Sequence, residues 1–170
     1  MTPLGRPRVE RVLGIDPGTA STGFAVVDRV GTVLTPVWYD CLRTTPKESP
    51  SARLVRISGA VCEVLDHLQP DVVGIEDLYF GANARAALAV GQARGVCILA
   101  CAERGLEVHE YTPATIKQAV TGYGQADKQQ VQRMVQQILG MSAPPRPDHC
   151  SDAFAVAICH AGSARYASHV

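Results

Sequence analysis

The sequence predicts a mixed α/β sheet, and the pattern of its first half carries that prediction. Three closely spaced apolar segments follow one another with links too short for a crossover helix, which predicts an antiparallel meander. Helical and strand-like patterns then alternate, which is typical of further strands added to the same sheet with helices packed on it. The 170 residues suit a single domain, with a core from about residue 11 to 160 and short tails.

The meander is expected at residues 11–16, 23–28 and 32–42. Its first strand is apolar and ends on a carboxylate, Asp16, after which Pro17-Gly18 turns the chain. Glycine at position 18 lets another group approach closely, so Asp16 could be exposed as a cation ligand. A plain strand-to-turn junction is the alternative, since Asp, Pro and Gly are common in turns for local reasons.

The middle of the chain predicts a helix over 51–68, a strand over 71–76 and a long helix over 83–104. The strand is an almost continuous apolar run, as expected when both faces are covered, and it ends on a second carboxylate, Glu76. The long helix is rich in alanine and glycine, which permits close approach of another segment. It is therefore expected to be either deeply buried or a surface for a partner.

The last part of the chain has clear helix signals. Thr112 and Pro113 form a good helix start, and the stretch 142–147 is a proline-rich connector. The remaining elements are expected to be a strand at 107–111 and helices at 112–121, 127–139 and 148–160.

Composition restricts the class of protein without naming a function. The formal net charge is zero, so overall charge neither implies nor excludes a nucleic-acid partner. Six cysteines occur without a C-x-x-C pair, which favours reduced structural thiols over a disulfide or a zinc site. Charged residues or glycine interrupt every apolar run, and no signal-type segment is evident, so we expect a cytoplasmic protein with no membrane partner.

Acidic residues in three segments can form one site. Asp16 and Glu76 end strands that can be neighbours, and the last helix offers Asp152 with Asp148 or His149 on the same face. Such an oxygen-rich cluster, with at most one imidazole, suits Mg²⁺ or Mn²⁺. Without a cation, the carboxylates would raise one another's pKa values. Helix capping explains an acid at position 148, so the residues leave open whether Asp148 or His149 joins the cluster.

Two further pairs of residues are candidates for contact with a ligand. Tyr79 and Phe80 follow Glu76 and can either anchor a loop or stack on exposed bases. Lys117 and Lys128 are solvent-exposed lysines by default. They gain a functional role only if their helices border the acidic cluster.

Six short motifs occur in order along the chain: Gly14-Ile15-Asp16-Pro17-Gly18, Ile75-Glu76, Gly91-Gln92-Ala93-Arg94-Gly95, Lys117-Gln118, Lys128-Gln129-Gln130-Val131 and Asp152-Ala153. Taken together, they resemble the motifs of the RuvC Holliday junction resolvases, and the resemblance covers about residues 11–160. The resemblance implies a ribonuclease H-like five-stranded sheet, with a three-strand antiparallel meander, two parallel strands and helices on both faces. It also implies a homodimer that cuts four-way DNA junctions in recombination and repair.

The same resemblance implies roles for named residues. It places Asp16, Glu76, His149 and Asp152 as catalytic metal ligands for Mg²⁺ or Mn²⁺, two ions per active site. His149 is preferred to Asp148 because its offset of three residues from Asp152 matches the family pattern.

The residues expected to bind DNA by this resemblance are Tyr79, Phe80, Arg85, Lys117 and Lys128. The aromatic pair would hold unstacked bases near the crossover, and the two lysines would bind phosphates or offset charge in the transition state. Paired nicks would leave 5′-phosphate and 3′-hydroxyl ends. Branch-migration proteins are suggested as partners.

Three other functions compete with this prediction. The stretch Gly14–Thr19 also resembles the phosphate-binding first hairpin of actin-like and sugar-kinase ATPases, although this chain is too short to contain their second phosphate-binding half. A structure-specific DNA-binding module without catalysis is the second alternative. The third is an RNA-processing nuclease of similar fold, which would use the same metal chemistry.

Overall fold

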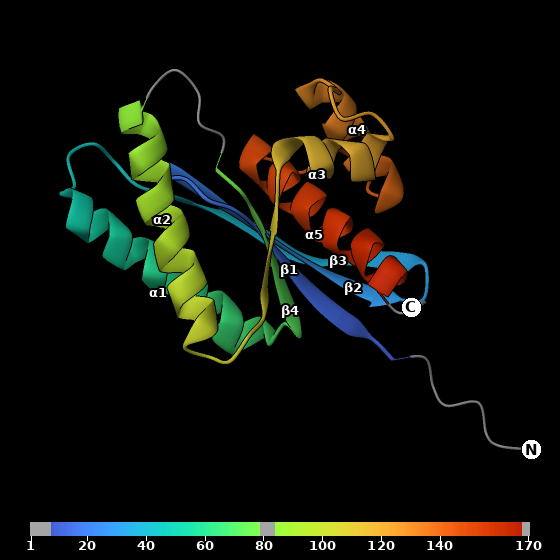
Figure 1. The fold of residues 1–170 in the computed structure, drawn as a ribbon, viewed down its shortest axis with the longest axis horizontal. Coiled ribbons are helices and arrows are strands. Elements are labelled where there is room, and N and C mark those ends of the chain that lie inside the picture. Colours follow the sequence, from blue (N-terminus) through green and yellow to red (C-terminus); the bar gives the residue numbers. More distant parts are fainter. Residues whose placement is uncertain (1–7, 79–83, 168–170) are drawn as a thin grey trace, which may run out of the picture.

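A computed structural model describes residues 8–78 and 84–167, and it has one five-stranded sheet in the order β3-β2-β1-β4-β5 (Figure 1). The first three strands form an antiparallel meander, while β4 is parallel to β1, and β5 is parallel to β4. The strands are β1 (Glu10–Asp16), β2 (Ser21–Val30), β3 (Val33–Arg43), β4 (Val72–Glu76) and β5 (Val108–Tyr111). This topology confirms the predicted ribonuclease H-like sheet.

Helices cover both faces of the sheet, with α1 and α2 on one face and α3, α4 and α5 on the other (Figure 1). The helices are α1 (Pro50–Leu68), α2 (Ala84–Ala102), α3 (Pro113–Thr121), α4 (Lys128–Ile138) and α5 (Asp148–Ala167). The sequence pattern predicted every helix and strand, but it predicted two of them too short. β2 extends beyond 23–28 because its backbone pairing with β3 continues from Ser21 to Val30, and α5 continues beyond residue 160.

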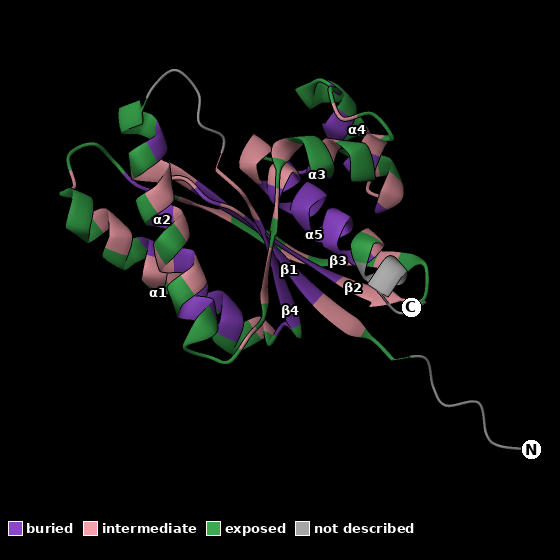
Figure 2. Ribbon diagram, viewed as in Figure 1, coloured by how far each residue is buried: buried purple, intermediate pink, exposed green. Residues whose placement is uncertain are grey.

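Two apolar cores lie on the two faces of the sheet, and the central strands are buried between them (Figure 2). Along β1 the side chains alternate: Val12 belongs to the core under α5, whereas Leu13 and Ile15 belong to the core under α1 and α2. By the same alternation, Asp16 at the end of β1 faces the α5 layer.

Glycines let α5 lie directly on the sheet. A Cβ atom at Gly14 of β1 would come within 2.1 Å of the carbonyl oxygen of Ala153, and one at Gly23 of β2 would come within 2.1 Å of the carbonyl oxygen of His149. Any other residue at these positions would push the start of α5 away from the strands. These glycines therefore set the distance between the sheet and α5, the helix that carries His149.

Gly18 has a more local role than the sequence predicted. A Cβ atom there would lie 2.5 Å from the carbonyl oxygen of Ser21, within the same turn. Thr22 Oγ1 also donates a hydrogen bond of 2.7 Å to the Gly18 carbonyl. Gly18 therefore keeps the turn between β1 and β2 compact. The atoms that approach it closely belong to this same turn.

The helix α2 is long and apolar enough to cross a membrane by length and composition alone, which the sequence analysis did not anticipate. Its inner face includes Ala93, Cys97 and Cys101, which are buried in the core shared with α1. Core helices of globular proteins pass the same test, so this finding is weak evidence for a membrane span. Its outer face exposes Leu88 and Leu99, and a Cβ atom added at Gly95 would meet no atom of the described residues within 4 Å.

Candidate metal centre

The candidate site begins where two neighbouring strands end. β1 and β4 are parallel, with Ile15 opposite Ile75, so the next residue of each strand, Asp16 and Glu76, lies at the same edge of the sheet. Both carboxylates face the α5 layer, because Ile15 and Ile75 point into the core on the other side. The Asp16 carboxylate lies near enough to Glu76 to oppose its ionisation.

The start of α5 supplies the other members of the cluster. His149 Nδ1 lies 2.7 Å from Asp16 Oδ2, and Asp152 follows one turn later on the same face of the helix. Ligand atoms from Asp16, His149 and Asp152 all lie within 4.8 Å of one another. These residues can hold a hard divalent cation, with one imidazole nitrogen added to carboxylate oxygens.

The electrostatics of the site favour a bound cation. Burial, together with the neighbouring Asp16 carboxylate, raises the pKa of Glu76 to about 8. Burial and Asp16 also raise the pKa of Asp152, whereas the hydrogen bond with Asp16 raises the pKa of His149. Carboxylates whose ionisation is opposed in this way gain most from a positive charge placed among them.

Both candidate lysines border the acidic cluster, which was the condition for giving them a role. Lys117 from α3 and Lys128 from α4 line a cavity of about 300 Å³ together with Glu76 and Asp152. Lys128 Nζ lies 3.1 Å from Asp152 Oδ2. Desolvation opposes the charge of Lys128, but the nearby aspartates outweigh it and raise the pKa of the amine.

Local sequence signals hold these two lysines in place. Thr112 caps α3, with its side chain accepting a hydrogen bond from the backbone of Thr115. Asp127 begins α4 with a capping box that it shares with Gln130. Lys128 therefore occupies the first turn of a well-defined helix, directly across from α5.

Asp148 lies beside the cluster without belonging to it. Its carboxylate contacts Arg146 and lies 3.7 Å from Lys128 Nζ, and 41% of its side chain is exposed. Among the described residues, a ligand atom of His149 lies within 4.8 Å of ligand atoms of Asp16 and Asp152. The geometry therefore favours His149 over Asp148 as the fourth candidate ligand.

Of the other three predicted DNA-binding residues, the structure describes one, Arg85. Tyr79 and Phe80 fall outside the described residues. Arg85 is exposed in the first turn of α2, in the layer opposite α5. The sequence analysis also missed the supporting role of Gly14 and Gly23, although a glycine inside a strand is a known sign of close backbone approach.

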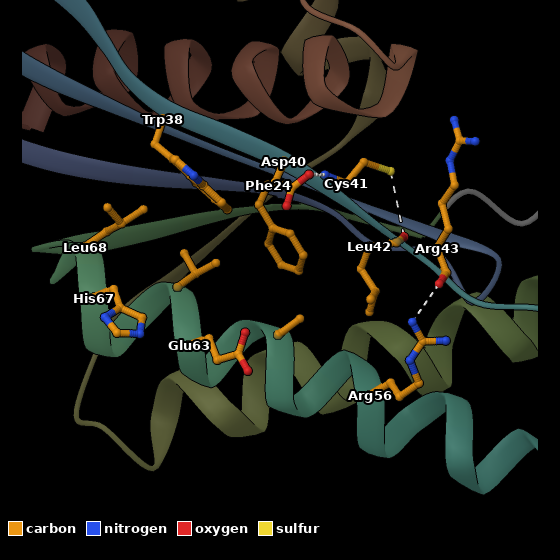
Figure 3. A pocket seen from close by; sticks show the side chains of 12 residues that line it. Phe24, Trp38, Asp40, Cys41, Leu42, Arg43, Arg56, Glu63, His67 and Leu68 are labelled. Carbon is orange, nitrogen blue, oxygen red and sulfur yellow. Dashed lines mark hydrogen bonds between the residues drawn. The ribbon is translucent and has the colours of Figure 1, made fainter.

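A second cavity, of about 500 Å³, lies between β3 and α1 on the other face of the sheet (Figure 3). Apolar side chains such as Trp38, Phe24 and Leu42 line its inner part, while Arg56 points to its rim and donates a hydrogen bond to the Arg43 carbonyl. It is separated from the acidic cluster by the sheet, and it contains none of the predicted site residues.

The sheet topology and the acids at its central strand ends place the chain in the ribonuclease H-like class, and comparison with known proteins gives the family. A family model described as crossover junction endodeoxyribonuclease RuvC matches residues 12–160. The RuvC of Moorella thermoacetica is 51% identical over 153 residues, covering 90% of this chain and 92% of that protein. The RuvC of Chloroflexus aggregans is 51% identical over 155 residues, covering 91% and 94%.

Solved structures agree with this result. The Thermus thermophilus RuvC structure has a TM-score of 0.86 at 38% identity, covering 92% of this chain and 96% of that chain. The same protein in complex with Holliday junction substrate has a TM-score of 0.88 at 37% identity, covering 94% and 97%. The yeast mitochondrial Holliday junction resolvase Ydc2, at 14% identity and a TM-score of 0.67, shares the fold.

The chain belongs to the RuvC family of crossover junction endodeoxyribonucleases. The predicted family and class of enzyme are therefore confirmed. The family assignment favours a nuclease over the ATPase and over the module without catalysis.

Proposed function

We propose that the cluster of Asp16, Glu76, His149 and Asp152 is the active site with which this enzyme resolves four-way DNA junctions. The observation that carries the proposal is the convergence of three of these side chains within 4.8 Å, beside a Glu76 whose ionisation is opposed by burial. Such a group of acids is costly unless a cation binds there. Membership of the family indicates the reaction, and we propose that this reaction takes place at the cluster.

The donor set fits Mg²⁺ or Mn²⁺, and we propose two ions per active site. Carboxylate oxygens suit both metals, and the single imidazole is compatible with Mn²⁺. When bound, such ions supply an activated water and stabilise the leaving oxygen of the phosphodiester, which would leave 5′-phosphate and 3′-hydroxyl ends. The four side chains would orient the ions against the end of the sheet.

The two lysines would act on the DNA backbone. Lys117 and Lys128 line the same cavity as Glu76 and Asp152, so each ammonium group can meet a phosphate that approaches the cluster. Their positive charges also reduce the repulsion between the acidic cluster and the DNA. Arg85, Tyr79 and Phe80 are also proposed to bind DNA, and the aromatic pair would hold unstacked bases near the crossover.

The proposed substrate and assembly are a four-way junction and a homodimer. The Thermus thermophilus relative has been solved in complex with Holliday junction substrate. The outer face of α2 carries Leu88, Gly95 and Leu99 on one side of the helix, and this exposed apolar stripe supports contact with a second copy. Two active sites related by a two-fold axis would make paired, symmetric nicks. Cytoplasmic location and branch-migration partners remain predictions.

A substrate comparison tests this function. The protein is incubated with a mobile four-way junction, a linear duplex and an RNA/DNA hybrid, each with Mg²⁺, with Mn²⁺ and with a chelator. We expect metal-dependent symmetric nicks in the junction and little cutting of the duplex or the hybrid. Preferential cutting of the hybrid would instead support the RNA-processing alternative, and cutting in the presence of the chelator would contradict the metal centre.

A further inference from the structure

An ion-pair cluster lies beneath the end of β4, on the face of the sheet opposite the acidic cluster. Arg94, in the middle of α2, places its Nη2 atom 3.2 Å from Asp77 Oδ1 and in close contact with Glu110 Oε2. We call these three residues the Arg94 clamp. Asp77 directly follows Glu76 in the chain, so the clamp holds the residue next to a proposed metal ligand.

Strand alternation places the clamp and the site on opposite faces. Ile75 points into the core under α2, and Glu110 is its register partner on β5, so the Glu110 side chain lies on that face. Glu76 points the other way and lines the cavity with Lys117 and Asp152. The clamp therefore touches neither the proposed ions nor the phosphate.

The clamp joins three elements at one point. Arg94 belongs to α2 and Glu110 to β5, while Asp77 extends β4 and donates its backbone N–H to the Tyr111 carbonyl at 2.8 Å. Asp77 Oδ1 also accepts a hydrogen bond of 2.7 Å from the backbone of Leu78. The end of β4 is thus fixed by α2 and β5 together.

A close contact at Gly91 supports the same arrangement. A Cβ atom at this position would lie 3.1 Å from Leu78 Cδ1, so the glycine lets α2 approach the residue that follows Asp77. Gly91 and Arg94 lie three residues apart and share a face of the helix. The stretch from Gly91 to Gly95, one of those that carry the family resemblance, therefore serves in part to hold the end of β4.

The burial of the Arg94 guanidinium indicates a role beyond packing. Only 14% of the Arg94 side chain is exposed, and its Nε atom has no hydrogen-bond partner among the residues that the structure describes. Burying a charged guanidinium costs desolvation free energy, which an apolar residue at this position would avoid. What arginine adds is a rigid group that can bind two carboxylates at once.

We propose that Arg94 is a positioning residue of the metal centre, which holds the end of β4 so that Glu76 meets Asp16 and Asp152. This inference rests on the proposed metal centre. Side chains that hold a metal must be fixed to within about 0.5 Å, and the groups behind them provide that precision. Arg94 acts through Asp77 and the β4 backbone, without contact with DNA.

The test compares Arg94→Ala with Arg104→Ala in the full-length protein. Arg104 follows α2 and pairs with Asp66 of α1, so its loss removes a similar ion pair away from the site. Mn²⁺ affinity is measured by calorimetry without DNA, and junction cutting is measured in single turnover. We expect Arg94→Ala to weaken Mn²⁺ affinity about 10-fold and to slow cutting by at least about 10-fold. Junction affinity in Arg94→Ala, and all three quantities in Arg104→Ala, should stay near wild type.

A conservative variant and a site variant complete the design. Arg94→Lys keeps the charge but loses the planar group, so its Mn²⁺ affinity and cutting rate should fall between those of wild type and Arg94→Ala. If Arg94→Ala does not fold, Arg94→Lys takes its place, with weakened Mn²⁺ affinity as the expected result. Asp16→Asn shows whether the metal centre itself is correct, because it should lose Mn²⁺ binding.

Wild-type Mn²⁺ affinity and cutting rate in the folded Arg94 variants would overturn the proposal. Equal losses in Arg94→Ala and Arg104→Ala would also overturn it, since they would indicate general destabilisation. If Asp16→Asn binds Mn²⁺ like wild type, the metal centre is wrong. If Asp16→Asn loses Mn²⁺ and the Arg94 variants do not, only the role of Arg94 is contradicted.

Discussion

At the scale of single residues, the site depends on charges that the fold brings together at a cost. Only 14% of the Asp16 side chain is exposed, and it meets the imidazole of His149 on one side and Glu76 on the other. Lys128 balances part of this charge through Asp152. The same repulsion that makes the cation-free site unfavourable would provide much of its affinity for a divalent ion.

The buried carboxyl group of Glu76 leads to a prediction about stability. Its folded-state pKa, about 8, lies above the ordinary value of 4.5, so its contribution to folding is fully present below about pH 4.5 and is lost as pH rises through about 8. Without metal, Glu76→Gln should therefore be more stable than wild type at about pH 8, by about 4 kcal/mol, with an advantage of less than about 1 kcal/mol at about pH 5. Urea unfolding in a chelator, at both pH values, measures the difference.

The comparison between variant and wild type removes the effect of titrating groups far from Glu76, and the response of its neighbours Asp16 and Asp152 is part of the measured difference. Added Mn²⁺ should stabilise wild type more than Glu76→Gln, since the variant lacks one proposed ligand. An advantage of the variant that is equal at both pH values would show that Glu76 ionises normally in the folded protein.

At the scale of elements, α5 is the part that assembles the site. It carries His149 and Asp152, and it packs on β1 and β2 through the glycines at positions 14 and 23. Its position sets the distance from these ligands to Asp16. The sequence predicted the helix from its pattern, but not its depth, because the depth depends on which residues of distant strands lack a side chain.

Gly23→Ala tests the depth of α5. The added Cβ would overlap the His149 carbonyl, so we expect a loss of about 2 kcal/mol in the free energy of unfolding, and slower cutting because His149 is displaced. Gly59→Ala is the matched control, since Gly59 lies in α1 and an added Cβ there would meet no described atom within 4 Å. Thermal unfolding and single-turnover cutting should show a stable, active Gly59→Ala protein. Normal stability and activity in Gly23→Ala would contradict the close packing.

At the scale of the whole molecule, more of the sheet could be predicted from the sequence than of the side-chain contacts around it. Apolar periodicity located all five strands, and strand ends indicated that Asp16 and Glu76 would meet, because neighbouring parallel strands end at one edge. The Arg94 clamp escaped prediction, since it joins α2, β4 and β5 by side chains far apart in the chain. Spacing alone also could not show whether His149 or Asp148 joins the cluster. The two residues are adjacent at the start of a helix, and only the packing of that helix decides which side chain faces Asp16.

The most direct test of the central claim measures junction cutting and junction binding by Asp16→Asn, with Asp148→Ala and His149→Ala beside it. We expect Asp16→Asn to bind the four-way junction almost like wild type and to lose cutting with either Mg²⁺ or Mn²⁺. His149→Ala should also lose most cutting, while Asp148→Ala, outside the cluster, should keep it. Loss of cutting in Asp148→Ala alone would reverse the choice of His149, and cutting by Asp16→Asn at the wild-type rate would contradict the metal centre.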